Sequence, residues 1–397
     1  MKMNDFQKTI KNPFVKRITN GLTRLEGQEW AQDRKLLNPA FHMEKLKHMM
    51  PSFHASSNEI IQEWEKMTSE IGSSEVELWS FLHNLSADAI SRAAFGSSFE
   101  EGRRVFELIR EHISITVQSM QSVYIPGSRF LPTKTNKREA KITNEMESLL
   151  KDMIQRRQKE MEGGEVAKDD LLGLLLKSNL EGIQEQHHFK MGMKEIIEEC
   201  KMFYIAGQET TSSLLVWTLV LLSKHQNWQD QAREEILTTF GHNTPHIDGL
   251  NHLKKVNMII HEVLRLYPPA PSLTRKVSRE MKVGDAILPA GVHVKLPLVI
   301  VHQSEKFWGS DAKEFNPDRF VQGISKATGG KICFFAFGWG PRICIGSNFA
   351  MLQVKMALAM ILQCFSLELS PSYVHAPTAG RGTLRPQFGA KVVLHRI

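Results

Sequence analysis

A single cysteine near the C-terminus carries the clearest chemical signal in the chain. Cys344 lies in the segment FGWGPRICIG, which ends at Gly346. A thiolate needs an acceptor for its charge, and iron is the obvious one. Gly340 and Gly346 would let backbone N–H groups approach the sulfur and tune it. Phe337 would exclude water, and Arg342 could pair with a carboxylate of the ligand.

The alternative role for Cys344 is that of a buried structural cysteine in a turn, which is the commonest fate of a single thiol. Phe337, Gly340, Arg342 and Gly346 stand at matching positions around it and favour the ligand role over that alternative. An apolar helix is expected directly afterwards, over residues 347–364, and this loop-then-helix context is what a ligand loop requires.

Two further segments hold polar residues at helical spacing. Glu262 and Arg265 are three residues apart in EVLR and therefore share a helix face, although such pairs are common on surfaces. In AGQETT, a glycine and two threonines inside an apolar helix lower its propensity and can open the hydrogen-bond ladder. The resulting groove could hold a small ligand near Glu209 and Thr210. The alternative is an ordinary exposed polar face, which the apolar flanks disfavour.

The elements that must position these residues change character along the chain. Apolar residues recur at three- and four-residue spacing before the Tyr267-Pro-Pro break, which predicts a mostly helical region. Beyond it, short β-branched runs predict strands and a small β lobe. No linker marks a second domain, so one domain over residues 1–397 is expected. The predicted helices cover residues 27–38, 44–71, 76–94, 101–123, 137–161, 191–224, 228–239 and 252–266, and the predicted strands cover 282–288, 292–301 and 389–396.

Composition narrows the class of protein. Apolar residues make up 42% and charged residues 23% of 397 residues, an ordinary globular mixture. The four cysteines show no CxxC pair, which is typical of reduced thiols and makes a zinc site unlikely. The net charge of +7 is modest and dispersed, without the aromatic–basic interleaving that single-stranded nucleic acid needs. The sixteen histidines show no ligand spacing and read as ordinary surface and core residues.

The N-terminal segment MKMNDFQKTIKNPFVKR is basic and polar, without an apolar core for a signal peptide or an anchor. The longest apolar stretch, residues 214–222, is far too short to span a membrane and reads as part of a soluble helix. The sequence as given is therefore expected to span no membrane.

The ordered set of motifs resembles the cytochrome P450 family. ExxR at Glu262 and Arg265 comes first, PxRF at Arg319 follows, and FxxGxRxCxG at Cys344 comes last. The resemblance implies a mainly helical fold with a small β lobe and a haem b group whose iron takes Cys344 as its axial ligand. It also implies that Glu262, Arg265 and Arg319 form a buried structural triad behind the haem.

The resemblance assigns roles to other positions as well. The AGxET segment, with Ala206, would face the oxygen side of the haem, where the Thr210 hydroxyl helps to deliver protons and Glu209 connects it to solvent. Trp30 and Arg34, in a WxxxR pattern, would lie at a haem propionate, as would Arg275. A surface arginine is an equally good interpretation of Arg275.

The segment GDAILPAGVHVKLPLVIVHQSEKFWGSDAKEFNPDRFVQGISKATGG resembles the plant branch that contains secologanin synthase and related terpenoid and hormone hydroxylases. This implies an apolar terpenoid, steroid or hormone-like substrate, dioxygen, and electrons from NADPH–cytochrome P450 reductase. Full-length relatives of this kind would lie at the cytosolic face of the endoplasmic reticulum membrane. They run roughly a hundred residues longer, so this chain is expected to lack the anchor, the first helices and the strand partners of residues 282–301.

Three functions stay open at this level. The first is a haem-thiolate monooxygenase acting on an apolar substrate. The second is a non-catalytic, haem-binding isoform, which the shorter N-terminal region favours. The third is a haem-thiolate isomerase or dehydratase that uses no dioxygen, and the Glu209-Thr210 pair disfavours it.

Overall fold

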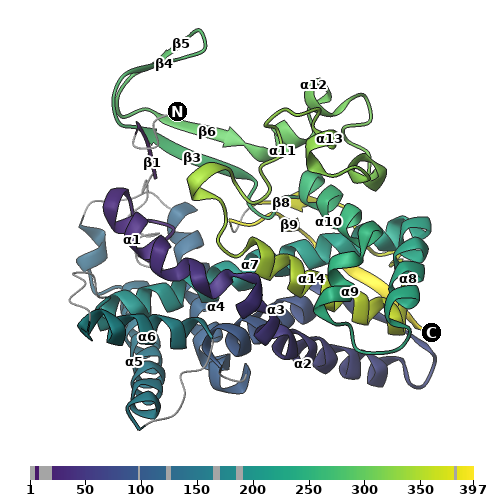
Figure 1. Cartoon of the computed structure of the whole chain (residues 1–397), viewed down its shortest axis with the longest axis horizontal. Helices are drawn as coiled ribbons and strands as arrows, with labels where there is room; N and C mark the ends of the chain where they lie inside the picture. Colours follow the sequence, from purple (N-terminus) through teal and green to yellow (C-terminus); the bar gives the residue numbers. More distant parts are fainter. Residues whose placement is uncertain are drawn as a thin grey trace. The chain divides into compact units, whose positions relative to one another are not determined.

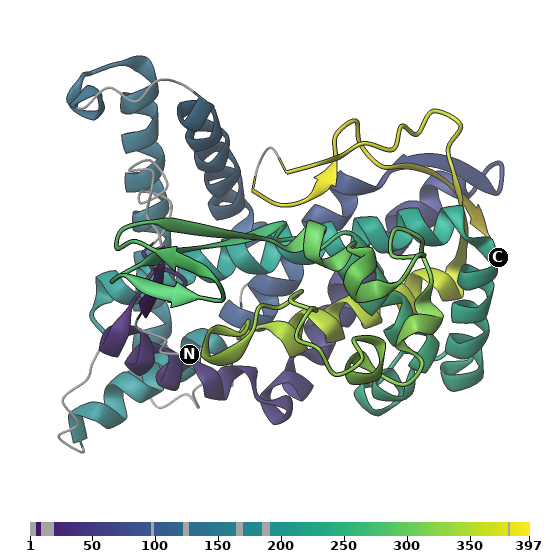
Figure 2. The same ribbon diagram turned by 90° about the horizontal axis from the view of Figure 1, so that it is seen from above.

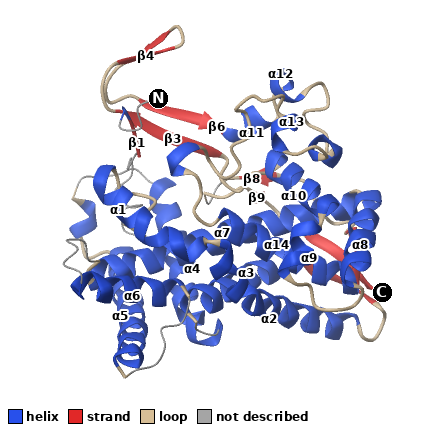
Figure 3. Cartoon of the chain, viewed as in Figure 1, coloured by secondary structure: helices blue, strands red, loops and turns tan. Residues whose placement is uncertain are grey.

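The structure is a computed structural model of the chain, and it describes residues 5–8, 20–96, 99–121, 127–163, 170–184, 191–379 and 382–397. Helices dominate these ranges and the strands form small sheets (Figures 1 and 3). The predicted fold class, mainly helical with a small β lobe, is confirmed.

The contacts within the chain gather into two compact units, which are described here separately. Unit 1 takes its described residues from 1–45, 90–206 and 274–296. Unit 2 takes its described residues from 46–89, 207–273 and 297–397. The single domain expected over residues 1–397 stays a prediction.

Aromatic packing organises the helices of unit 1. Tyr204 is fully buried, stacks on Phe95 with 4.2 Å between ring centroids, and meets Phe106 edge-on at 4.8 Å. Such pairs add to the free energy of burial beyond the area they remove from water. The helical segments are α1 (Gly27–Leu37), η3 (Asn38–Phe41), α4 (Phe99–Gln121), η4 (Ser128–Phe130), α5 (Lys134–Glu162), α6 (Leu171–Gln184) and the first part of α7 (Met193–Lys224).

The strands of unit 1 correct two predictions. The run 282–288 is a hairpin rather than one strand, because Gly284 turns the chain with φ of +60°. The strand predicted over 292–301 ends at Pro297, which cannot donate to a ladder, and residues 298–302 are helical. The strands are β1 (Phe6–Lys8), β3 (Ser272–Val277), β4 (Met281–Val283), β5 (Ala286–Leu288) and β6 (His293–Pro297).

The sequence analysis expected residues 282–301 to lack their strand partners, and this expectation was wrong in part. The three-stranded sheet has the order β1-β3-β6, and β1 pairs with β3 in antiparallel register, Phe6 opposite Val277 and Lys8 opposite Arg275. A short segment at the start of the chain therefore supplies a strand to β3.

A buried helix, α14 (Ser347–Cys364), lies at the centre of unit 2. Twelve of its 18 residues are buried, and the apolar side chains point to all sides, which is the mark of a core helix. It packs against α8 and α9 (Figure 1). The helical segments of unit 2 are α2 (Met43–Thr68), most of α3 (Leu78–Phe95), the second part of α7, α8 (Gln226–Phe240), α9 (Ile247–His252), α10 (Lys254–Leu266), α11 (Leu298–His302), α12 (Glu305–Trp308), η5 (Pro317–Phe320), α13 (Ile324–Ala327), η6 (Gly340–Arg342) and α14.

The larger sheet of unit 2 joins distant parts of the chain. Its order is β2-β10-β7, with both neighbours antiparallel to β10. The last strand, β10, is the yellow arrow beside the C label in Figure 2. Val392 and Leu394 are buried at alternate positions of β10, as expected for a sheet with one face in the core. The strands of this unit are β2 (Ser73–Glu77), β7 (Phe365–Leu369), β8 (Pro377–Thr378), β9 (Arg385–Pro386) and β10 (Lys391–Arg396).

Helix α7 is the one described helix that is long and apolar enough to cross a membrane by length and composition. Since 72% of its apolar window is buried inside the protein, these properties are also those of a core helix. The helix runs without interruption through residues 206–211. The local opening of its hydrogen-bond ladder there stays a prediction.

Candidate functional site

The cysteine loop of unit 2 is held by its own backbone. The Cys344 N–H donates to the Phe337 carbonyl at 2.8 Å, and the Gly338 N–H donates to the Phe335 carbonyl at 2.8 Å. Gly338 and Gly340 have φ of +78° and +69°, a region that side chains disfavour, so glycine is required at both positions. Gly346 instead precedes α14 with φ of −89°, and its role does not depend on a special conformation.

The side chain of Cys344 is exposed, whereas Cys200 and Cys333 are buried. Two large apolar side chains beside it, Trp339 and Ile343, are also 58% and 42% exposed. Phe337 and Arg342 are half-buried. An exposed thiol bordered by exposed apolar side chains fits a large, flat apolar group that carries a metal with one soft thiolate ligand. Among the described residues, no group of three or more His, Cys, Asp or Glu side chains could hold a bare metal ion.

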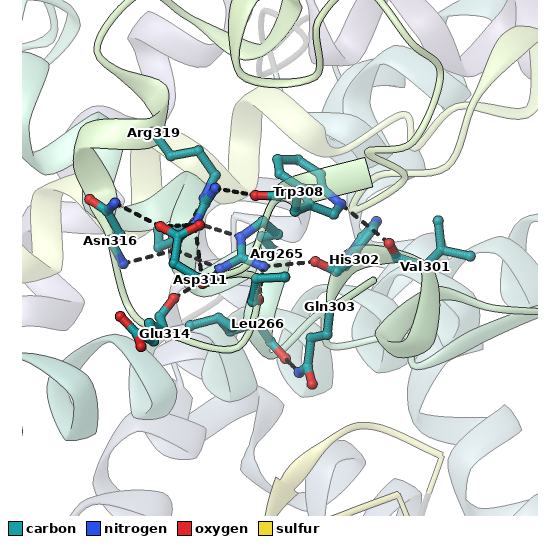
Figure 4. A network of polar contacts seen from close by, with 12 residues as sticks. Arg265, Leu266, Val301, His302, Gln303, Trp308, Asp311, Glu314, Asn316 and Arg319 are labelled. Atoms are coloured by element: carbon teal, nitrogen blue, oxygen red, sulfur yellow. Dashed lines mark hydrogen bonds and ion pairs between the residues drawn. The ribbon is translucent and has the colours of Figure 1, made fainter. Parts of the chain in front are cut away.

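A closed ion pair lies on α10 in the same unit. Glu262 and Arg265 are both 0% exposed and form two parallel hydrogen bonds of 2.7 Å. Figure 4 shows Arg265 of this pair among its neighbours. The remaining three N–H groups of Arg265 donate to the carbonyls of His302, Ala312 and Glu314. All five guanidinium donors are therefore used, which is what keeps a fully buried cation tolerable.

Arg319 lies at the edge of this pair rather than inside it. Its Nε is 3.8 Å from Glu262 Oε1, and its hydrogen bonds go to the Trp308 and Asp311 carbonyls at 2.7 and 3.2 Å. It also forms an ion pair of 2.7 Å with the Asp311 carboxylate (Figure 4). The three residues predicted as a triad are thus brought together, with Arg319 acting mainly on the 308–311 segment.

His302 links this network to the cysteine loop, a role that sequence reasoning missed. Its carbonyl accepts from Arg265, and its Nε2 accepts the Phe335 N–H at 2.8 Å, where the loop begins. Burial lowers the pKa of His302 to about 4, so the ring is neutral and can accept. Because the bond is made to a backbone N–H thirty-three residues away, no spacing rule in the sequence indicates it.

The polar segment of α7 holds a second polar network in unit 2, made of hydrogen bonds. The carboxylate of Glu209 lies 3.0 Å from Nε2 of His83 on α3 and accepts the Thr383 hydroxyl at 3.4 Å. Ala206 and Thr210 are one turn apart and half-buried in a helix that is mostly buried elsewhere. Sequence reasoning indicated Glu209 and Thr210 but not His83 or Thr383.

Burial raises the pKa of Glu209, but the hydrogen bond from His83 and the nearby positive charge of Arg385 oppose this, and the pKa lies below its ordinary value. The carboxylate is therefore ionised at neutral pH. A carboxylate whose side chain is 18% exposed still reaches solvent and can exchange protons with its surroundings.

The remaining predicted residues belong to unit 1. Trp30 is buried on α1, and Arg34, one turn further, donates from Nε to the Asn38 side chain at 2.8 Å. Arg275 is half-buried on β3 and donates to the Thr274 carbonyl at 2.9 Å. Burial lowers the pKa of Arg275. Their predicted role at the propionates of the bound group stays a prediction.

Comparison with solved structures shows the fold. The crystal structure of the cytochrome P450DA heme domain superposes with a TM-score of 0.86 over 99% of this chain and 84% of that chain, at 23% sequence identity. Curated plant proteins are much more similar in sequence. Cytochrome P450 CYP72A219 of Panax ginseng is 54% identical over 100% of this chain and 77% of its own length.

Two further relatives are named for reactions. Echinocystic acid 23-monooxygenase of Saponaria officinalis is 50% identical and 11-oxo-beta-amyrin 30-oxidase of Glycyrrhiza uralensis is 48% identical. Each comparison covers 100% of this chain, and 77% and 76% of the two relatives. The family model for cytochrome P450 matches residues 1–393. The chain belongs to the cytochrome P450 family, and its cofactor is haem b.

Proposed function

We propose that this cytochrome P450 is a haem-thiolate monooxygenase that oxidises an apolar terpenoid, with dioxygen as co-substrate and with electrons from NADPH through a reductase. The observation that supports it most is the exposed Cys344 thiol on a glycine-closed loop, flanked by exposed apolar side chains. The names of two plant relatives support the substrate class, since they specify echinocystic acid and 11-oxo-beta-amyrin.

Each residue then has a defined task in binding haem. Cys344 supplies the thiolate that holds the iron, and haem, when bound, supplies the metal at which dioxygen is reduced. Gly338 and Gly340 keep the loop in the conformation that presents the sulfur. We assign Arg342, with Trp30, Arg34 and Arg275, to the propionates, because a cation donates charge-assisted hydrogen bonds to carboxylates.

Two residues of α7, Glu209 and Thr210, are assigned to proton delivery. Glu209, ionised and 18% exposed in its side chain, can take protons from solvent. The Thr210 hydroxyl on the next position can hold and pass on a proton at its Oγ1. Oxidation of a C–H bond with dioxygen consumes two electrons and two protons, so a supply of protons on the reacting side is required.

The cellular setting is part of the proposal. A reductase that takes electrons from NADPH and an apolar substrate both suit the cytosolic face of the endoplasmic reticulum membrane, as expected for full-length relatives. The dispersed net charge of +7 suits a loose encounter with an acidic electron donor.

The first test is the carbon-monoxide difference spectrum of the reduced protein after haem loading. A strongly red-shifted Soret band is expected for the native chain and should be absent in Cys344→Ser. Cys364→Ser is the matched control, since Cys364 is a half-buried thiol at the end of α14 and should keep the band. A native chain without the shifted band, or a Cys344→Ser variant that retains it, contradicts the assignment.

A further inference from the structure

The Glu209 carboxylate forms hydrogen bonds with side chains from two separate segments of unit 2. Nε2 of His83 on α3 lies 3.0 Å from Oε1, and the Thr383 hydroxyl donates to Oε2 at 3.4 Å. The side chains of His83 and Glu209 are 6% and 18% exposed. Both carboxylate oxygens therefore have a donor, while one edge of the acid stays open to solvent.

Gln208 decides which ring nitrogen of His83 carries the proton. Its side-chain nitrogen contacts the His83 carbonyl at 3.4 Å and Nδ1 of the same residue at 3.1 Å. A carbonyl accepts only, so the amide nitrogen must donate there, and its second hydrogen then points at Nδ1. Nδ1 is the acceptor, and the proton of the neutral ring sits on Nε2, facing Glu209.

The surroundings of this group hold the ring in place. Trp79, one turn before His83 on α3, stacks on the imidazole with 5.7 Å between centroids. The Arg385 guanidinium of β9 lies over the Trp79 ring at 5.2 Å, and its charge acts on Glu209. Among the residues that the structure describes, the charged or titratable groups that face Glu209 are His83 from α3 and Arg385 from β9, with the neutral Thr383 beside them.

We propose that His83, held in its Nε2–H form by Gln208, is a positioning residue that fixes the orientation of the Glu209 carboxylate and keeps it an anion by donating to it. The consequence for turnover, delivery of protons through Glu209 to Thr210, rests on the proposed function. The orientation and ionisation of Glu209 do not, because they are properties of the protein itself.

The lowered pKa of Glu209 agrees with this arrangement. Burial alone raises the pKa, and the His83 hydrogen bond is the largest contribution that opposes it. Removing the donor should therefore raise the pH at which the acid ionises.

The ionisation can be measured without turnover, from infrared difference spectra of the haem-loaded protein against Glu209→Gln over a pH series. The midpoint of the carboxylate band is expected to rise by about one pH unit or more in His83→Leu, which has no donor. His83→Gln, whose amide can donate from a similar position, should restore most of the native midpoint. An unchanged midpoint in folded His83→Leu overturns the proposal.

Gln208→Leu is the second variant and keeps His83 itself. Without the amide, the ring is free to take either tautomer, so a smaller upward shift of the same midpoint is expected. If His83→Leu fails to fold, a native midpoint in Gln208→Leu together with a raised one in His83→Gln overturns the proposal.

His112→Leu is the matched control, because Nε2 of His112 also lies beside a buried carboxylate, 3.5 Å from Glu139. It should leave the Glu209 midpoint unchanged even if it lowers the free energy of unfolding. A shift of equal size in this control would show a general loosening of the fold and would overturn the specific role of His83.

The share of NADPH electrons that ends in peroxide gives the second readout. It is expected to rise severalfold in His83→Leu and to return toward the native value in His83→Gln. If the infrared midpoint shifts but peroxide release does not, the role of His83 stands and the proton-delivery role of Glu209 fails.

Discussion

Two helix carboxylates in unit 2 have opposite environments. Glu262 on α10 is closed to solvent and shares two hydrogen bonds with an arginine whose five donors are all used. Glu209 on α7 keeps an 18% exposed side chain and is held by a neutral histidine and a distant hydroxyl. A saturated network suits a structural role, since any change costs several bonds. A partly solvent-exposed network, such as that of Glu209, suits proton exchange, because water can replace one of its hydrogen-bond partners.

Arg265→Lys should have the largest effect on stability. Lysine has three donors on one nitrogen and cannot reach Glu262 and three carbonyls, so a buried charge loses its partners. We expect a loss of about 3–5 kcal/mol in the free energy of unfolding, with failure to retain haem. Urea denaturation followed by far-UV circular dichroism measures it.

The control is Arg104→Lys, which also removes an arginine paired with a glutamate three residues away. Arg104 and Glu107 are 45% and 49% exposed, so the change should leave the free energy of unfolding close to its native value. Equal losses for the two variants would erase the contrast between the closed and the exposed pair.

Thr210→Ala changes turnover rather than stability. We expect NADPH consumption to continue while product per NADPH falls about tenfold or more and peroxide accumulates, because the proton donor on α7 is lost. Thr218→Val on the same helix removes a buried hydroxyl that donates to the Leu214 carbonyl, and coupling should be retained. If Thr210→Ala forms as much product per NADPH as the native chain, the proposed role of α7 in proton delivery is wrong.

His302→Leu breaks the link between the Glu262–Arg265 network and the cysteine loop. The Phe335 N–H loses its acceptor, which should cost about 1–3 kcal/mol and increase the fraction of protein with a blue-shifted carbon-monoxide band. His302→Gln, with a carbonyl that can accept, should recover part of the loss. An unaltered spectrum in the leucine variant would show that the loop is held independently of α10.

The pKa of His302 adds a pH dependence to this prediction. The folded-state pKa is about 4 against an ordinary 6.5, so between these values the unfolded chain binds a proton that the folded chain does not. Stability from this group is therefore present above pH 6.5 and is lost as the pH falls toward 4. Thermal melts of the leucine variant should lack this part of the acid dependence.

Glu199 in unit 1 extends this comparison, because it is a buried acid that forms no ion pair among the described residues. Burial, with the nearby charge of Asp33, raises its pKa from 4.5 to about 8, and its Oε2 has no hydrogen-bond partner among the described residues. Between these values the folded state binds a proton that the unfolded chain releases, so stability falls as the pH rises from 4.5 to 8.

Glu199→Gln removes this penalty. We expect the variant to be more stable than the native chain at pH 8, by about 1 kcal/mol or more, and to differ little near pH 5. Melting temperatures at the two pH values measure it. A variant that is destabilised equally at both would indicate that the carboxylate is ionised and paired.

Much of the fold could be predicted from periodicity. The helix expected over 347–364 is α14 without any change of bounds, and the expected 191–224 and 252–266 became α7 and α10 with shifts of two residues at the start. Five of the described α-helices were not predicted. Helices α9, α11, α12 and α13 span four to six residues each, too few for a periodic pattern. Helix α6 is so rich in leucine that its apolar residues do not define one face.

The residues of the candidate site also fall into two groups, those that the sequence indicated and those that it did not. The motif residues Cys344, Glu262, Arg265, Glu209 and Thr210 were visible because their spacing along the chain is part of the signal. His83 and His302 were not, since each acts on a residue far away in sequence, and sixteen histidines without ligand spacing offered no way to choose between them.

The sequence by itself determined the family, the residue types that can bind haem and move protons, and the helices that carry them, because these follow from local spacing and composition. Only the tertiary structure decided which carboxylate is sealed and which stays open, since desolvation and the choice of hydrogen-bond partner depend on what packs around a side chain. Glu262 and Glu209 are the same amino acid on helices of the same unit. Their different neighbours make one a structural anchor and the other a candidate proton carrier.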